Sequence, residues 1–357
     1  MRLKTIFFLL SLFFIQGLAQ DNVSIRIDTV FAKILFKSGV GNVTGGDGAI
    51  SFPLPGSRSL FLWGDSFYGG VSGNTRPSDA PFISGNSISV VEGEKAVTIT
   101  KGTPDAPAAF FTTPNKDSLR TVQWPGHGFC KSGSAYIFLE NIVMTGKGTF
   151  DFYWHSIDLA EVSLKDFRIV RTFNIPSKAI NGIHFGFGCM QEKDYIYTYG
   201  SKKIGEKNKL FVMRYKNTSP ENLDMEFYTG KGWSRNAVEA TPLSGKMVSL
   251  SEQFSVFRYK KKYVLLTQKH GSREIYTYVS STPYGPWGKE HMIYDTPEYG
   301  LKKGWTTYNA MAHPQYIDRG WMLVGYCVNT LDFPQLWSDI TSYQPRFFWV
   351  KLKDILK

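Results

Sequence analysis

The sequence predicts an all-β fold, a five-bladed β-propeller, and three observations lead to that prediction. A short polar segment followed by an apolar run, which together make one phrase of the repeat, recurs five times along the chain. Successive copies start roughly 55 to 80 residues apart, and this spacing is typical of propeller blades. Aromatic residues make up 15% of the chain and glycine occurs 34 times, as expected for many strands and turns. Helical periodicity is hard to find after residue 20. The five apolar runs are Leu60–Trp63, Tyr136–Leu139, Tyr195–Tyr197, Tyr263–Leu266 and Trp321–Val324.

We expect one domain over residues 20–357, with blades that begin near residues 47, 124, 183, 250 and 308. The first blade shows the pattern most clearly. A turn rich in Pro and Gly at 53–58 separates two apolar runs, so residues 48–54 and 60–65 are expected to be its two inner strands. Outer strands are expected at 84–92 and 96–100 in blade one, 151–158 and 167–172 in blade two, 210–215 in blade three, 274–280 in blade four and 347–350 in blade five.

The last blade is one strand short at its C-terminal end. The segment 23–36 has the composition of a strand but precedes the first repeat. We expect it to complete the last blade, because that pairing would close the ring and remove an exposed sheet edge.

Residues 1–19 have the features of a signal peptide. Arg2 and Lys4 precede the apolar stretch Ile6–Ile15, and small residues allow cleavage after Ala19. Cysteine does not follow the expected cut, so lipid anchoring is not expected, and the stretch is too short to favour a retained membrane helix. The sequence therefore predicts a secreted or periplasmic protein that is not inserted into a membrane.

Charge and cysteine usage restrict the partners. The net charge is +11, but the lysines are scattered or lie in turns such as Lys260–Lys262. Binding of nucleic acid would need a continuous basic face, so it is not expected.

Three cysteines cannot all pair, and buried free thiols are expected, with a Cys130–Cys189 disulfide as the alternative. Metal-ligand spacing is not found among them. We expect a monomer that binds carbohydrate and needs no cofactor, while a structural calcium ion is left open.

Three carboxylates are candidates for catalysis: Asp47, Asp65 and Glu252. Asp47 lies between glycines at the start of an inner strand, and Asp65 follows the second strand of the same blade. Glu252 opens the inner strand of blade four, which would place it across the axis from Asp47. Glycoside hydrolysis uses two carboxyl groups about 5 to 10 Å apart. The alternative is that Asp47 and Asp65 cap turns through their own backbones. Glu140 is a further acidic candidate, although it is expected on the polar face of its strand.

Five further residues are candidates for binding a sugar. The histidines His127, His184 and His313 lie near the starts of three inner strands, and Asn309 opens the fifth phrase. Trp305 is expected in a loop, where its ring could stack on a sugar. Alternative roles for the histidines are to assist a carboxylate or to bind a metal, which is the least favoured because zinc sites show tighter spacing.

The chain after the leader resembles a known family in its arrangement, and the specific motifs of the resemblance lie in the first third. Thr44–Leu54 followed by Leu62–Phe67, with Phe82–Ser87 and Trp124–Phe129, is similar to the opening of the DUF4185/DUF5005-like secreted propellers of Bacteroidetes and actinobacteria. The resemblance implies a five-bladed fold like that of furanosidase propellers, and some relatives hydrolyse D-arabinan. Asp47 and Asp65 match the family pattern. His127 departs from it, since relatives commonly have Asp in the motif Trp-Pro-Gly-Asp-Gly.

These observations lead to one main prediction and two alternatives. The main prediction is an exported glycoside hydrolase that acts on a polysaccharide, with furanoside linkages of the arabinan type as candidates. In it, Asp47 and Glu252 share the acid and base or nucleophile roles, and Asp65 orients them. The first alternative is a propeller that binds carbohydrate without cleaving it, which His127 in place of an acid favours. The second is a protein-interaction scaffold.

Overall fold

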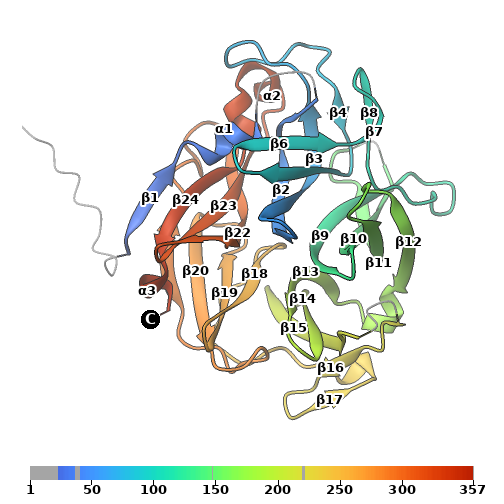
Figure 1. Ribbon diagram of the computed structural model, residues 1–357, viewed down its shortest axis with the longest axis vertical. Helices are drawn as coiled ribbons and strands as arrows, with labels where there is room; N and C mark the ends of the chain where they lie inside the picture. The colour runs from blue at the N-terminus through green and yellow to red at the C-terminus, as the bar shows by residue number, and fades with distance from the viewer. Residues whose placement is uncertain (1–22, 37–40, 147, 219–221, 357) are drawn as a thin grey trace, which may run out of the picture.

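A computed structural model describes residues 23–36, 41–146, 148–218 and 222–356. The predicted signal peptide, residues 1–19, lies outside the described residues. Five antiparallel sheets surround a central axis, so the prediction of a five-bladed β-propeller is confirmed (Figure 1). None of the helices in the described ranges is both long and apolar enough to cross a membrane.

Each blade is a meander that runs from the axis outward. The strands of blade one are β2 (Val43–Leu54), β3 (Arg58–Tyr68), β5 (Ser87–Glu92) and β6 (Lys95–Ile99), with β4 (Phe82–Ile83) paired to β3. Those of blade two are β9 (Thr121–Lys131), β10 (Ser134–Met144), β11 (Phe152–Ser163) and β12 (Ile169–Pro176). Those of blade three are β13 (His184–Gln191), β14 (Tyr195–Ile204), β15 (Lys207–Lys216), β16 (Glu226–Tyr228) and β17 (Trp233–Ser234).

Blades four and five follow the same plan. The strands of blade four are β18 (Ser255–Tyr259), β19 (Lys262–Gln268), β20 (Glu274–Ser280) and β21 (His291–Asp295). Those of blade five are β22 (Trp305–Asp318), β23 (Trp321–Thr330), β24 (Arg346–Lys351) and β1 (Ile25–Asp28). The remaining elements are the hairpin β7 (Lys101–Thr103) and β8 (Ala106–Ala108), and the short helices α1 (Phe31–Leu35), η1 (Ser177–Ile180), η3 (Ala237–Glu239), α2 (Gln335–Ser338), η4 (Ile340–Tyr343) and α3 (Leu352–Ile355).

The N-terminal strand closes the ring, as expected. β1 pairs antiparallel with β24 on the outer edge of blade five, and the inner strands β22 and β2 are in contact (Figure 1). The expected strand over 23–36 is too long, however, because Phe31–Leu35 is helical. Asp28 explains the change of structure, since its carboxylate accepts hydrogen bonds from the N–H groups of Val30 and Phe31 at 3.0 and 2.5 Å.

The core lies between the blades, and this explains why the apolar runs do not alternate. In β3, Leu60 and Leu62 pack against blade two, while Phe61 and Trp63 pack against blade five. All four side chains are fully buried. Because both faces of each blade contact a neighbour, a strand near the axis must be apolar on both faces.

Four of the five inner strands depart from regular pairing with their neighbour. The register shifts at Gly46–Ile50 in β2, at Phe185–Gly188 in β13 and at Tyr308–Met311 in β22. In β9 the shift lies opposite Ile137–Leu139 of the paired strand β10. These bulges fall within the polar phrases that open the repeats. A β-bulge changes the direction of nearby side chains and is common beside active sites.

The glycines of the Trp124–Phe129 segment allow close contact between blades. A Cβ atom on Gly126 would lie 2.5 Å from the carbonyl oxygen of Gly186 in the next inner strand. We therefore expect Gly126→Ala to lower the free energy of unfolding by roughly 1–3 kcal/mol, because the backbones must move apart. Urea denaturation of this variant and of Gly232→Ala, where a Cβ meets no atom within 4 Å, checks the prediction. Equal midpoints for the two variants would contradict it.

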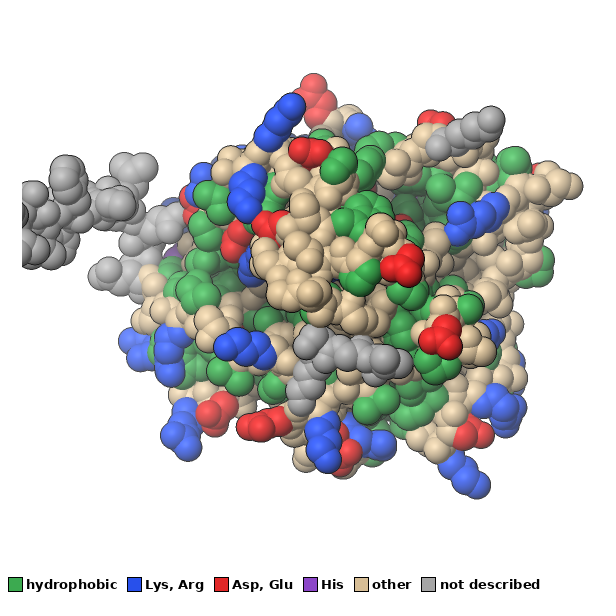
Figure 2. Space-filling model, turned by 90° about the horizontal axis from the view of Figure 1, so that it is seen from above, with side chains coloured by type: hydrophobic (Ala, Val, Ile, Leu, Met, Phe, Trp, Pro, Cys, Tyr) green, Lys and Arg blue, Asp and Glu red, His purple; other side chains and the backbone are tan. Residues whose placement is uncertain are grey.

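The surface charges are mixed in sign. On the face shown in Figure 2, Lys and Arg side chains of the described residues are interspersed with Asp and Glu. Ion pairs at the surface of the described structure include Arg258 with Glu192 at 2.9 Å and Arg235 with Asp224 at 2.7 Å. Exposed pairs of this kind contribute little to stability, typically about 0–1 kcal/mol.

Candidate active site

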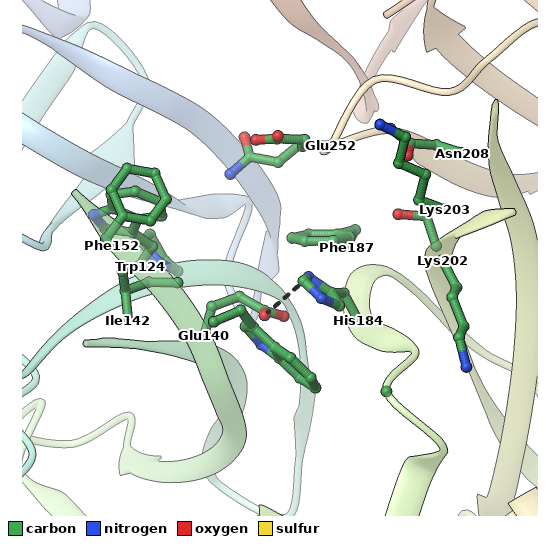
Figure 3. Close-up of a pocket in the computed structure, with 15 residues that line it drawn as sticks. Trp124, Glu140, Ile142, Phe152, His184, Phe187, Lys202, Lys203, Asn208 and Glu252 are labelled. Carbon is green, nitrogen blue, oxygen red and sulfur yellow. Dashed lines mark ion pairs between the residues drawn. The ribbon is translucent and has the colours of Figure 1, made fainter. Parts of the chain in front are cut away.

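A cavity of about 230 Å³ lies beside the bulges of the inner strands β9 and β13, where Pro125 and Phe187 line it. Blades two and three form most of its wall, and the segment that precedes β18 in blade four completes it (Figure 3). It is smaller than the roughly 300–1,000 Å³ of pockets for drug-sized ligands, so it fits one small unit of a ligand. Its lining residues are Trp124, Pro125, Glu140, Ile142, Phe152, Trp154, Gly182, His184, Phe187, Ser201, Lys202, Lys203, Asn208, Glu252 and Gln253.

Aromatic rings form one part of the cavity wall. The rings of Trp124 and Phe152 meet edge to face with centroids 5.0 Å apart. The ring of His184 stacks on Trp154 at 4.0 Å. Because β9, β11 and β13 carry these rings and are held by the blade sheets, the wall is rigid. Flat rings with a polar edge suit ligands that present both apolar C–H groups and hydroxyls.

Glu140 places a buried carboxyl group on the same wall. It lies on β10, directly opposite Trp124 in the register, and is only 4% exposed. Neither of its oxygens has a hydrogen-bond partner among the described residues, and the Nδ1 atom of His184 is 3.9 Å from Oε2. Burial raises the pKa of Glu140 well above its usual value; the Trp154 indole partly opposes this, and the charge of Glu252 adds to it. A carboxyl in this position is expected to hold its proton at neutral pH.

His184 does not supply a compensating charge. Burial lowers its pKa to about 4, so the imidazole is neutral at pH 7. The contact with Glu140 is therefore not a salt bridge at that pH. The neutral ring of His184 stacks on Trp154 and does not balance a charge on Glu140.

Glu252 lies on the opposite side of the cavity from Glu140 (Figure 3). It is exposed, in contrast to Glu140. Water can solvate its carboxylate, so Glu252 can carry a negative charge without the cost of desolvation. Two carboxyl groups in environments this different can take the acid and base roles of one reaction.

The expectation for Glu140 was wrong, and the reason is visible in its strand. β10 reads SAYIFLENIVM and is buried on both faces for most of its length, so it has no polar face. A charged residue in the middle of such a strand must be buried. Glu and Asp are rarely buried unless paired, and that signal in the sequence strengthens Glu140 as a candidate.

Asp47 occupies a different environment, at the contact between blades one and five. The hydroxyl of Tyr308 donates to its Oδ1 atom, and the hydroxyl of Tyr343 donates to Oδ2 at 2.7 Å. Burial raises its pKa to about 7; the two tyrosines lower it, and the charge of Asp65 raises it. Asp47 does not line the cavity described above.

Asp65 connects Asp47 with the cavity. Its Oδ1 atom accepts a hydrogen bond from the N–H of Gly85 at 2.6 Å, and its backbone oxygen accepts from Tyr343 at 3.0 Å. Burial raises the pKa of Asp65, while hydrogen bonds from Gly85 and Trp124 lower it. Asp65 thus lies beside Trp124, whose ring forms part of the cavity wall.

The ionisation of Asp47 is expected to make stability depend on pH. The folded state holds the proton more tightly than the unfolded chain, so the contribution of Asp47 is fully present below pH 4 and is lost as pH rises towards 7. Wild type loses this contribution and Asp47→Asn does not. From pH 4 to pH 7, the free energy of unfolding of Asp47→Asn should therefore rise by roughly 2–4 kcal/mol relative to that of wild type. Denaturant unfolding at several pH values measures the difference. Asp105→Asn, at an exposed site, controls for the loss of one charge. A constant difference between Asp47→Asn and wild type would contradict the prediction.

His127 and His313 face the interior rather than the cavity. The Nδ1 atom of His313 lies 2.6 Å from Ser51 Oγ, and the side chain is fully buried. The Nδ1 atom of His127 lies 2.9 Å from the Gly128 carbonyl oxygen. Burial lowers the pKa of His127 to about 4 and that of His313 to about 3. Of the three histidines predicted to bind a sugar, the structure places only His184 at the cavity.

Trp305 and Asn309 also lie away from the ligand space. Trp305 begins β22, is 6% exposed, packs between blades four and five, and donates from Nε1 to Gln335 Oε1 at 2.6 Å. It is not in a loop. Asn309 is 8% exposed and is bound to the segment that carries Glu252.

The three cysteines are free, as expected. Cys189 and Cys327 are buried and Cys130 is partly exposed. The described residues contain no group of three or more His, Cys, Asp or Glu side chains placed to hold a metal ion.

Comparisons with known proteins agree with this architecture. The model of the family "Domain of unknown function (DUF5005)" matches residues 28–352. Among curated proteins, no significant match was found. A presumed hydrolase from Bacteroides ovatus ATCC 8483 has a similar structure, with a TM-score of 0.75 and 18% identity over 92% of this chain and 90% of that one.

Two glycoside hydrolases have similar structures at lower scores. The family 117 glycoside hydrolase Zg3597 of Zobellia galactanivorans has a TM-score of 0.52 and 10% identity, over 92% of this chain and 91% of that one. The β-xylosidase RS223 has a TM-score of 0.51 and 13% identity, over 92% and 94%. At these identities the likeness shows a shared fold, the propeller of glycoside hydrolases.

Proposed function

Because this chain belongs to the DUF5005 family and has the propeller fold of glycoside hydrolases, we propose that it hydrolyses glycosidic bonds of a carbohydrate at the cavity lined by Glu140 and Glu252. One observation supports this proposal most strongly. A buried carboxyl with no hydrogen-bond partner in the described structure and an exposed carboxyl line the same cavity, whose wall is aromatic. Buried polar groups without partners are rare in proteins unless they have a function.

In the proposed reaction, Glu140 is the general acid. Its proton passes to the glycosidic oxygen as the bond from that oxygen to the anomeric carbon breaks, so the leaving sugar departs as a neutral hydroxyl. Water adds to the anomeric carbon and loses a proton. In one route Glu252 accepts that proton. In the other, Glu252 first bonds to the anomeric carbon as the glycosidic bond breaks; water then displaces Glu252, which leaves as a carboxylate, and the proton of the water returns to Glu140. The separation of the two carboxyls decides between these routes.

Asp47 remains a competing candidate for the acid. Its pKa of about 7 suits proton transfer near neutral pH. Against this role, both of its oxygens already accept hydrogen bonds from Tyr308 and Tyr343. We propose that Asp47 joins blades one and five and that Asp65 orients Trp124, while Glu140 and Glu252 carry out the chemistry.

The substrate and location follow from the sequence. We propose a polysaccharide with furanoside linkages of the arabinan type, on the basis of the resemblance in residues 44–67. The apolar leader at residues 1–19 supports action outside the cytoplasm. A cavity for one small unit suits an enzyme that holds a single sugar residue beside the bond that it cleaves.

The test is a screen of arabinans, xylans and other polysaccharides for release of reducing ends, with binding measured by calorimetry on the same samples. Hydrolysis by wild type and its loss in Glu140→Gln would support the proposal. Binding without product release over long incubation would favour the non-catalytic carbohydrate-binding propeller, which His127 in place of an acid also favours. Absence of both would favour the protein-interaction scaffold.

A further inference from the structure

The segment 250–253 carries Glu252 into the cavity without belonging to a strand. It precedes β18, and an isolated bridge joins Leu250 to Lys269, the residue that follows β19. Glu252 itself is exposed, whereas Ser251 on one side of it is 3% exposed and Phe254 is fully buried. The position of the Glu252 carboxylate therefore depends on what holds its neighbours in the chain.

One side chain holds both residues next to Glu252. The Oδ1 atom of Asn309 accepts a hydrogen bond from the Ser251 hydroxyl at 2.7 Å and another from the Gln253 N–H at 3.1 Å. The backbone N–H of Asn309 donates to Ser251 Oγ at 3.1 Å. Three hydrogen bonds thus connect the residues flanking Glu252 to a single position of β22.

The backbone of β22 explains why asparagine occupies this position. Asn309 has φ of 55°, in the left-handed region, where the strand bulges between Tyr308 and Met311. Asn adopts this conformation more readily than most residues, and its short side chain supplies an acceptor oxygen. The bulge places that oxygen beside the neighbouring blade.

The other end of the segment is held by blade three. The side-chain amide of Asn208 donates to the Leu250 carbonyl at 3.0 Å, and the Leu250 N–H donates to the Asn208 carbonyl at 3.3 Å. Asn208 also lines the cavity. The segment is therefore fixed between blades three and five, with Glu252 as its exposed residue.

We propose that Asn309 is a positioning residue that holds Glu252 across the cavity from Glu140, an inference that rests on the proposed hydrolysis. Asn309 acts through the backbone at Ser251 and Gln253 rather than by binding the sugar. The position of a reacting group is important, since a 1 Å displacement can cost about 10²-fold in rate.

The experiment compares Asn309→Gly with Asn309→Asp. Glycine keeps the left-handed backbone but removes the acceptor, whereas aspartate keeps an acceptor oxygen at the same place. For Asn309→Gly we expect kcat to fall by roughly 10- to 100-fold with little change in KM. The kcat of Asn309→Asp should be close to that of wild type and well above that of Asn309→Gly. Ser251→Ala, which removes the hydroxyl bound to Asn309, should lower kcat in the same way if Asn309→Gly folds poorly.

A second readout does not require activity. The charge of Glu252 raises the pKa of Glu140, so displacement of Glu252 should lower the titration midpoint of Glu140 in Asn309→Gly and Ser251→Ala. Unchanged kcat and an unchanged midpoint in these variants would overturn the positioning role. If wild type hydrolyses no glycoside, the proposed function fails, and the midpoint alone then decides whether Asn309 positions Glu252.

Discussion

Glu140→Gln is expected to lower kcat/KM by roughly 10²- to 10⁴-fold on substrates whose leaving group is a sugar. Glutamine preserves the size of the side chain but cannot donate a carboxylic proton. The loss should be much smaller for a dinitrophenyl glycoside, whose leaving group needs no proton. The change should not unfold the protein, because glutamine fills the same space in β10 and carries no charge to bury.

Steady-state kinetics on the two classes of substrate measure this difference. Asp47→Asn is the matched comparison, because Asp47 is the competing acid. If the loss of kcat/KM depended on the leaving group in Asp47→Asn but not in Glu140→Gln, Asp47 and not Glu140 would be the general acid.

Glu252→Gln is expected to lower kcat/KM by a similar factor, roughly 10²- to 10⁴-fold, but for both classes of substrate. The reason is that a base or nucleophile is needed whatever the leaving group. In Glu252→Gly, added azide should restore part of the rate, because a small anion can take the place of the missing carboxylate.

Glu290→Gln is the control for Glu252, since Glu290 is exposed and does not line the cavity. Equal activities for Glu252→Gln and Glu290→Gln would remove Glu252 from the reaction. That result would also remove the reason for Asn309 to hold it.

The fold could be predicted because its main signal is local. Runs such as Leu60–Trp63 are apolar on both faces, which few arrangements other than stacked sheets satisfy, and their spacing gave the number of blades. The pairing of β1 with β24 followed from a missing strand. Helix α1 could not be predicted in this way, because the capping carboxylate of Asp28 interrupts a segment with the composition of a strand.

The site was predicted less well than the fold. A residue can be placed near the start of a strand from the sequence, but this does not determine the direction of its side chain. The polar segments that begin the repeats contain His127, His184, Asn309 and Asp47, but β-bulges shift the strand register in these segments. A shift by one residue turns a side chain to the other face. His184 therefore reaches the cavity and His127 does not. The apolar residues around Glu140 in β10 indicate its burial, but its place at the cavity depends on blade three, which the sequence of β10 does not show.

The central claim is that burial keeps Glu140 protonated beside an exposed Glu252, and carbon-13 NMR of labelled glutamate carboxyls tests it most directly. The Glu140 signal is assigned by its absence from the spectrum of Glu140→Gln. We predict the shift of a protonated carboxyl at pH 7, and a titration midpoint that falls in Glu252→Gln. The shift of an ionised carboxylate at pH 7, with no change in Glu252→Gln, would contradict the account.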